Sequence, residues 1–125
     1  MNETTSTSSN NSKRILVAED NDSNYLLVKH ILKAHQLTHA MNGVEAVKFM
    51  QEGEFDLILM DIKMPEMDGL EATRLIRQLH FTTPIVVVTA NAFDSDRANA
   101  FEAGCNDFIT KPLKKDELLA IVAKY

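Results

Sequence analysis

Acidic side chains follow two apolar segments of the chain, at points where strands should stop and loops begin. Asp61 follows the run Phe55–Met60, and Glu19 and Asp20 follow the run Ile15–Ala18. The carboxyl ends of neighbouring parallel strands meet at one edge of a sheet, so these three carboxylates would lie close together. Close carboxylates repel one another unless a cation joins them. Mg²⁺ suits such a set, because it takes a few carboxylate oxygens and keeps several water molecules.

Two further strand ends carry groups that could bind phosphate. The run Pro84–Val88 leads into Thr89, and the short run Asp107–Thr110 leads into Lys111. A lysine ammonium is a mobile point charge that suits phosphate, and a threonine hydroxyl can donate a hydrogen bond. Asp61 could then attack a phosphoryl donor as a nucleophile and form an acyl phosphate. Each residue alone has a more ordinary explanation, so the interpretation depends on their convergence at one edge.

Short apolar runs alternate along the chain with segments of helical period. The nearly continuous Ile, Leu and Val content of three runs is typical of strands that are covered on both faces. The alternation predicts an α/β fold: a doubly wound, five-stranded parallel sheet whose functional crevice lies at the carboxyl ends of the strands. We expect strands at 15–18, 37–41, 55–60, 85–89 and 108–110, and helices at 23–33, 44–52, 69–79, 95–103 and 115–123.

Several local signals accompany the expected helices. The first helix places Leu26, Leu27, His30 and Ile31 at helical spacing, with Asp22 or Ser23 as its candidate cap. Asp68 and Asp94 precede the third and fourth helices as candidate caps, and Gly104 ends the fourth. For the four histidines we expect surface or packing roles; they are His30, His35, His39 and His80.

Size and composition indicate one folded domain. The chain has 125 residues, of which 45% are hydrophobic, enough for a single core. Its net charge of -5 argues against non-specific binding of nucleic acid. The single cysteine, Cys105, excludes an internal disulfide. The sequence shows no apolar run long enough to span a membrane and no secretory signal pattern, so we expect a cytoplasmic protein. Residues 1–12 are rich in Ser, Thr and Asn, so we expect a disordered tail or linker before a domain at 13–125.

Taken together and in order, four motifs resemble the receiver domain of two-component response regulators. They are Glu19-Asp20, the stretch Asp61-Ile62-Lys63-Met64-Pro65-Glu66-Met67-Asp68-Gly69, Thr89-Ala90 and Lys111-Pro112. The resemblance covers nearly everything from Lys13 to Tyr125, and two details, Glu19-Asp20-Asn21 and Asn42-Gly43-x-Glu45-Ala46, are closer to receivers of hybrid sensor histidine kinases. It implies the flavodoxin-like fold, with sheet order 2-1-3-4-5 and helices on both faces.

The resemblance also implies a site. Asp61 would accept a phosphoryl group from a phosphohistidine, in two-component signalling or a phosphorelay. Mg²⁺ would be held by Asp20, Asp61 and the backbone carbonyl of Lys63, with Glu19 helping through water. The phosphoryl oxygens would be bound by two further residues, Thr89 and Lys111.

A signalling role follows from the same resemblance. Thr89 would be drawn toward the phosphoryl group, and Phe108, in the place of the switch aromatic, would turn inward behind it. The chain would be a phosphoacceptor that catalyses its own phosphorylation and dephosphorylation, not an enzyme with a separate substrate. Its partner would be a histidine kinase or a histidine phosphotransfer protein. We expect no direct contact with nucleic acid or membrane, and a monomer or weak homodimer.

The chain departs from the family pattern at a few positions. The end of the first helix, around Ala34-His35, lacks the glycine often found there, and Phe108 lacks the hydroxyl of a tyrosine. Lys63 and Asn91 occupy variable positions that tune the lifetime of the acyl phosphate. The peptide bond between Lys111 and Pro112 is a candidate for the cis isomer, which would fix the direction of the lysine.

The sequence alone leaves three other functional interpretations open. A metal-dependent phosphatase with an aspartyl nucleophile would need a second Asp where this chain has Lys63. A binding module that signals without phosphate would not need the full set of acidic, hydroxyl and ammonium groups. A flavin-binding module would need a phosphate loop where the chain has Glu19-Asp20-Asn21. The chain could be a stand-alone regulator or a fragment of a hybrid kinase.

Overall fold

The computed structural model describes residues 12–90 and 94–125. Residues 1–11 of the expected tail and Asn91 lie outside this part. Strands and helices alternate through the described residues, as the sequence predicts. The elements are β1 (Arg14–Ala18), α2 (Asp22–Ile31), β2 (Gln36–Ala40), α3 (Gly43–Glu52), β3 (Leu57–Asp61), α4 (Gly69–Gln78), β4 (Ile85–Thr89), α5 (Asp94–Ala103), β5 (Asp107–Thr110) and α6 (Lys115–Lys124).

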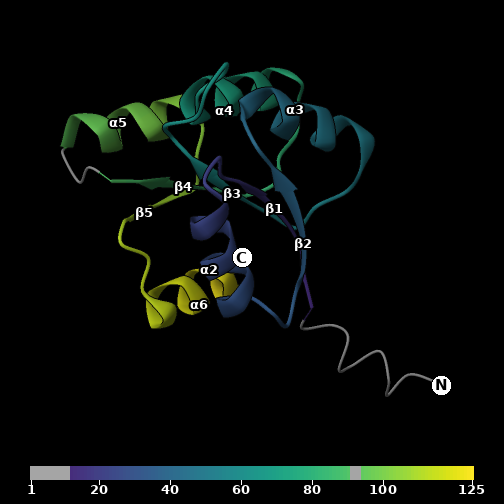
Figure 1. The fold of residues 1–125 in the computed structure, drawn as a ribbon. Helices are drawn as coiled ribbons and strands as arrows, with labels where there is room; N and C mark the ends of the chain where they lie inside the picture. Colours follow the sequence, from purple (N-terminus) through teal and green to yellow (C-terminus); the bar gives the residue numbers. More distant parts are fainter. Residues whose placement is uncertain (1–11, 91–93) are drawn as a thin grey trace.

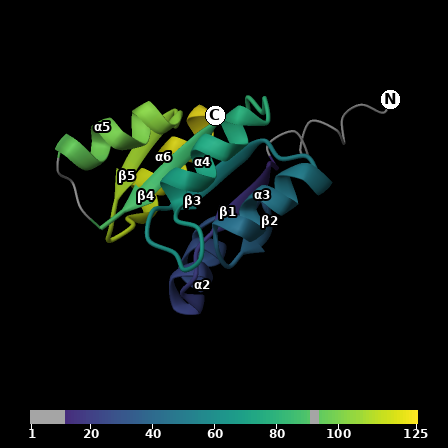
Figure 2. The ribbon, with the colours of Figure 1, turned by 90° about the horizontal axis from the view of Figure 1, so that it is seen from above.

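The strands form one parallel sheet in the order β2-β1-β3-β4-β5. Helices α3, α4 and α5 cover one face, and α2 and α6 cover the other (Figures 1 and 2). This arrangement confirms the predicted fold class and strand order. Because all strands point the same way, the ends of β1, β3, β4 and β5 meet at one edge. No helix within the described ranges is both long and apolar enough to cross a membrane.

Two apolar clusters hold the layers together. One lies under α3, α4 and α5 and includes Leu16, Ile58 and Met60; the other lies under α2 and α6 and includes Leu59 and Val86. Successive strand residues point to opposite faces, so each strand feeds both clusters. Every residue of β3 and β4 is buried, which explains their nearly continuous apolar sequence.

The first helix differs from the prediction in its cap and in its buried face. Its N-cap is Asn21, whose backbone is extended and whose side chain accepts a hydrogen bond from the N–H of Asn24 at 2.9 Å. The predicted cap at Asp22 or Ser23 is therefore wrong, because both residues already lie within the helix. Val28 and Ile31 are buried, as is Leu32 just beyond the helix, whereas the side chains of Leu26 and Leu27 are 60% and 44% exposed.

Strand β3 begins at Leu57 instead of at Phe55. Asp56 pairs with the first residue of β1: its N–H donates to the carbonyl of Arg14, and its side chain accepts from the N–H of Arg14 at 2.9 Å. The strand also extends to Asp61, so this carboxylate is part of the sheet and not of the following loop. The backbone of Asp61 pairs with Val88 of β4, and Met60 before it pairs with Ala18 of β1.

The turn after α2 closes without the glycine that is often found there. The C-cap Leu32 has φ of -100° and donates its N–H to the carbonyl of Val28. In the described part of the chain, only Glu66 and His80 among non-glycine residues have positive φ. The segment around Ala34-His35 therefore needs no left-handed residue.

Candidate functional site

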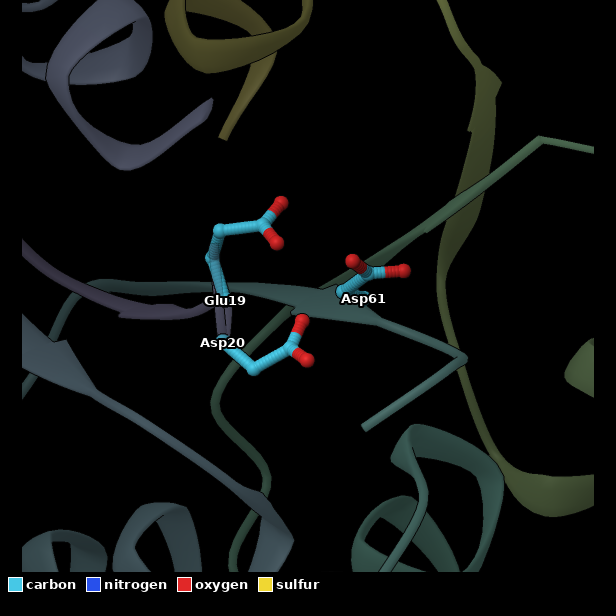
Figure 3. A group of neighbouring side chains, drawn as sticks. All are labelled: Glu19, Asp20 and Asp61. Carbon is cyan, nitrogen blue, oxygen red and sulfur yellow. The ribbon is translucent and has the colours of Figure 1, made fainter. Parts of the chain in front are cut away.

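The predicted acidic residues lie together at the carboxyl edge of the sheet. Glu19 and Asp20 follow β1, and Asp61 ends β3, the strand next to it. Each can offer one carboxylate oxygen such that all three oxygens lie within 4.8 Å of one another. Figure 3 shows the three carboxylate groups around a common space. This grouping is what a divalent cation requires of its protein ligands.

Lys111 reaches this group from the loop after β5. Its Nζ lies 2.8 Å from Oδ2 of Asp61 and 3.3 Å from Oε1 of Glu19. Burial alone would lower the pKa of Lys111, but hydrogen bonding and the charges of Asp61 and Glu19 raise it above its ordinary value. The lysine therefore stays charged at neutral pH and can meet an anion here. The peptide bond between Lys111 and Pro112 is cis.

The carboxylates hold more negative charge than Lys111 can balance. Glu19 and Asp61 are each only 5% exposed. Burial and then the charge of Asp61 raise the pKa of Glu19, although Lys111 and the N–H of Asn21 oppose the shift. Because the charge of Asp61 adds to the effect of burial, a nearby cation would stabilise the ionised form of Glu19. The donor set and its electrostatics therefore fit a hard divalent cation such as Mg²⁺.

A cavity of about 260 Å³ opens above the acidic group. Thr89, at the end of β4, is 4% exposed and lines the cavity together with Ala90 and Lys111. Lys63 also lines it, and its N–H donates to Oδ1 of Asp61 at 3.3 Å. A polar cavity with a carboxylate, a hydroxyl and an ammonium around it can hold a tetrahedral anion against Asp61.

The start of α4 is packed against the backbone of Asp61. The N–H of Gly69 donates to the carbonyl of Ile62 at 2.8 Å, and Asp68 caps the helix by accepting from the N–H of Glu71. A Cβ atom on Gly69 would stand 2.0 Å from the carbonyl oxygen of Asp61. Glycine is therefore required at this close approach, which explains its place at the end of the longest motif.

Phe108 lies on β5, beyond Thr89. It is half-buried and packs against the cluster under α3, α4 and α5. The guanidinium carbon of Arg97 lies 6.0 Å from the centre of its ring, at the limit of a cation–π contact. The structure therefore brings the predicted switch residues to the same side of the site, on neighbouring strands β4 and β5.

Sequence reasoning missed the contribution of the edge strand β2 to this site. His39 was expected to have only a surface or packing role, yet its Nε2 lies 2.7 Å from the carbonyl oxygen of Glu19. Tyr25 of α2 stacks on the imidazole. The only signal in the sequence is the position of His39 near the end of a strand, and this did not distinguish it from the other histidines.

The fold and the site together define a class of protein: a doubly wound domain with an acidic cluster, a hydroxyl and a lysine at the carboxyl edge of its sheet. Comparison with known proteins gives the family. Residues 15–123 match the response regulator receiver domain, and the chain belongs to this family. It is therefore a phosphorylatable signalling domain of the two-component and phosphorelay type.

Individual relatives agree with this assignment. The two-component response regulator ORR41 of Oryza sativa subsp. japonica is 41% identical over 118 residues, covering 90% of this chain and 93% of that protein. Hybrid signal transduction histidine kinase G of Dictyostelium discoideum is also 41% identical and covers 90% of this chain, but the match spans only 4% of that kinase. The chain likewise spans 6% and 17% of two other relatives, a second Dictyostelium hybrid kinase and two-component system protein A of Emericella nidulans.

Solved structures share the fold. The receiver domain of sensor histidine kinase PA1611 from Pseudomonas aeruginosa PAO1 superposes with a TM-score of 0.84 at 36% identity, covering 91% of this chain and 97% of that one. That crystal structure has a magnesium ion coordinated in its active site cleft. Chemotaxis protein CheY4 of Vibrio cholerae has a TM-score of 0.85 at 26% identity, covering 90% of this chain and 98% of that one.

Proposed function

We propose that Asp61 is the phosphoacceptor of this domain and that a phosphohistidine on a partner protein is its donor. One observation carries the proposal: Asp61 is a buried member of the acidic group, with Lys111 at 2.8 Å and a polar cavity beside it. In the transfer, an oxygen of Asp61 attacks phosphorus while the P–N bond to the imidazole breaks. The electron pair stays on that nitrogen, so the partner leaves as neutral imidazole when its other ring nitrogen is protonated.

Lys111 and Thr89 would bind the phosphoryl oxygens. Their positions on the cavity wall support this role, because charge on the transferring group is spread over its oxygens and fixed donors there lower the barrier. Dephosphorylation by water would use the same geometry. Water attacks phosphorus, the bond to Asp61 breaks, and the carboxylate is restored as phosphate leaves. We propose that the domain itself catalyses both steps.

The resident metal of this site would be Mg²⁺. Asp20, Asp61 and the backbone carbonyl of Lys63 would hold it directly, and Glu19 would hold it through water. The close grouping of the three carboxylates supports this assignment, as does the raised pKa of Glu19. When bound, the metal ion neutralises charge on the phosphoryl group during transfer.

The surface beside the site supports a protein donor. A groove of about 370 Å³ lies next to the cavity, and Leu27, Pro112 and Leu113 give it an apolar lining. Asn24 and Lys111 line both the groove and the cavity. A partner seated on this surface would bring its histidine to Asp61, which is the geometry required of a histidine kinase or a histidine phosphotransfer protein.

Phosphorylation would then act as a switch. It adds roughly -1.5 to -2 charges and new acceptor oxygens at one point. We propose that Thr89 moves toward these oxygens and that Phe108 turns inward behind it, which shifts a pre-existing equilibrium. An activated analogue in which Thr89 and Phe108 stay where the unmodified protein has them would contradict this step.

The wider setting follows from the same proposal. The net charge of -5 disfavours direct binding to nucleic acid, and the buried, free thiol of Cys105 suits a reducing compartment such as the cytoplasm. We propose that residues 13–125 form the receiver domain and that the protein is a monomer or weak homodimer. Light scattering during size-exclusion chromatography tests the last point.

Intact-protein mass spectrometry tests the central proposal. The protein is incubated with acetyl phosphate, with and without Mg²⁺, as wild type and as Asp61→Asn. The matched control is Asp56→Asn, which makes the same change just before β3, outside the site. We expect a labile, Mg²⁺-dependent gain of one phosphoryl group in the wild type and in the control, and none in Asp61→Asn. A gain that persists in Asp61→Asn would place the acceptor elsewhere, and catalytic turnover of a phosphate ester would favour a phosphatase.

A further inference from the structure

The backbone of Glu19 is held by two groups of the neighbouring edge strand. Its N–H donates to the carbonyl oxygen of Ala40 at 2.9 Å, and its own carbonyl oxygen lies 2.7 Å from Nε2 of His39. A carbonyl oxygen can only accept, so Nε2 carries the proton and donates. Strand β2 therefore provides hydrogen-bond partners for both backbone groups of Glu19. This residue begins the acidic turn, which we define as Glu19-Asp20-Asn21.

Tyr25 fixes the orientation of the imidazole. The two rings are stacked with their centres 3.7 Å apart and their planes 3° from parallel. Both residues are half-buried, and Tyr25 packs against the cluster under α2 and α6. A stacked ring in a packed layer has little freedom to rotate, so the N–H of His39 stays aimed at Glu19.

The acidic turn needs such support because its charges act against its position. The carboxylate of Glu19 is buried beside that of Asp61, and the two repel each other. The turn also folds on itself, since the N–H of Asn21 donates to Oε2 of Glu19 at 3.1 Å. Lys111 contacts both carboxylates and offsets only part of this repulsion, so an anchor on the backbone helps to hold the turn in place.

We propose that His39, braced by Tyr25, is a positioning residue for the metal site. It touches no ligand and acts through the carbonyl of Glu19, by holding the turn so that Glu19 and Asp20 face Asp61 before any metal binds. The inference rests on the proposed use of these carboxylates for Mg²⁺. A preorganised site binds its ion more tightly because less freedom is lost on binding.

Three variants separate positioning from simple packing. His39→Phe retains a stacked ring but removes the donor, and His39→Gln restores a donor near the place of Nε2. The control is Leu37→Ala, which removes apolar contact from the same face of β2 without touching Glu19. The Mg²⁺ dissociation constant is measured by calorimetry at pH 8. Amide hydrogen exchange at Glu19 is measured by NMR in the metal-free protein.

We expect His39→Phe to weaken Mg²⁺ binding about three- to tenfold, the effect of one lost hydrogen bond. Amide exchange at Glu19 should accelerate by a similar factor. His39→Gln should recover at least part of the affinity, and Leu37→Ala should bind Mg²⁺ as the wild type does despite its lower stability. Wild-type affinity and wild-type exchange in a folded His39→Phe protein would overturn the proposal.

If His39→Phe does not fold, Tyr25→Leu carries the same test, since it removes the stack and leaves the donor in place; weaker Mg²⁺ binding supports the proposal, and unchanged binding overturns it. If the wild type itself binds no Mg²⁺, the proposed metal site fails. The exchange rates in the metal-free variants then still decide whether His39 holds the turn.

Discussion

Replacing Gly69 by alanine should damage both the stability and the chemistry of this domain. Gly69 is the first residue of α4, and a Cβ atom there would lie 2.0 Å from the carbonyl oxygen of Asp61 and 2.8 Å from its carbonyl carbon. Both contacts are with backbone, which cannot move aside like the end of a flexible side chain. Ordinary contacts of a Cβ atom begin near 3.4 Å, so the helix and the strand end must separate by about 1.4 Å.

The size of the effect follows from this separation. An overlap in a packed interior costs about 1–3 kcal/mol, and loss of the 2.8 Å hydrogen bond from Gly69 to Ile62 adds about 0.5–1.5 kcal/mol. We therefore expect the free energy of unfolding to fall by about 1.5–4.5 kcal/mol. A displacement of about 1 Å at a reacting group lowers a rate by about a hundredfold. Phosphorylation at Asp61 should slow by about this factor.

Urea unfolding and the rate of acetyl phosphate-dependent phosphorylation measure the two effects. Gly53→Ala is the matched control: a Cβ atom at Gly53 would meet its nearest atoms, in Phe49 and Phe55, at 3.7 Å, and the backbone there is extended. We expect this control to keep wild-type stability and rate. A Gly69→Ala protein that is phosphorylated at the wild-type rate, with a free energy of unfolding within about 1 kcal/mol of the wild type, would contradict this prediction. That difference is smaller than the smallest expected cost.

Three further predictions concern charge and backbone strain. Lys111→Met should slow phosphorylation about a hundredfold or more, because the lysine would stabilise the transferring group in the proposed reaction. Mg²⁺ should bind at least as tightly in calorimetry, because the ammonium would no longer compete for the carboxylates; weaker Mg²⁺ binding would contradict this. His80→Gly should raise the free energy of unfolding by about 1 kcal/mol, measured in urea, since His80 is exposed and its φ is 71°; a lower stability would contradict it. Burial would raise the pKa of Asp107, but hydrogen bonds from Phe108, Tyr125 and Lys124 lower it below its ordinary 3.8. The ionised carboxylate therefore stabilises the fold above pH 3.8, and this stabilisation is lost as the pH falls through the pKa of the folded state. The melting temperature of Asp107→Asn should therefore lie below that of the wild type at pH 7, and the gap should close in acid; a constant gap would exclude the carboxylate as its cause.

The order of elements could be predicted because composition and connectivity leave few alternatives. Strands covered on both faces must be apolar throughout, and β3 and β4 are. The buried face of α2 could not be predicted in the same way. Leu26, Leu27, Val28 and Ile31 are all apolar, and helical spacing alone allows more than one buried stripe. Packing against the sheet selects Val28 and Ile31, and this choice depends on tertiary contacts that spacing does not contain.

The site also has a part that the sequence predicts and a part that it does not. The grouping of Glu19, Asp61, Thr89 and Lys111 follows from topology, since each lies at the end of a parallel strand or just after it. The role of His39 does not follow from topology. Its contact with Glu19 depends on the register that pairs Val17 with His39, and on a ring orientation set by a residue of another element. His39 belongs to no motif with a fixed spacing to Glu19 or Tyr25, so the sequence does not indicate this contact.

The charge of the site explains why phosphorylation can be sensed. Three carboxylates and one ammonium leave two negative charges when all are ionised, which one Mg²⁺ would balance. In the proposed reaction the carboxylate of Asp61 becomes a phosphoryl group with roughly -1.5 to -2 charges, so a balanced site becomes negative again. Lys111 and Mg²⁺ would already be balanced by the original carboxylates. The additional negative charge would therefore have to be stabilised by neutral hydrogen-bond donors. In the proposed switch, Thr89 at the end of β4 would supply such a donor. Its neighbour β5 carries Phe108, so the need for one more hydrogen bond would move residues that lie outside the site.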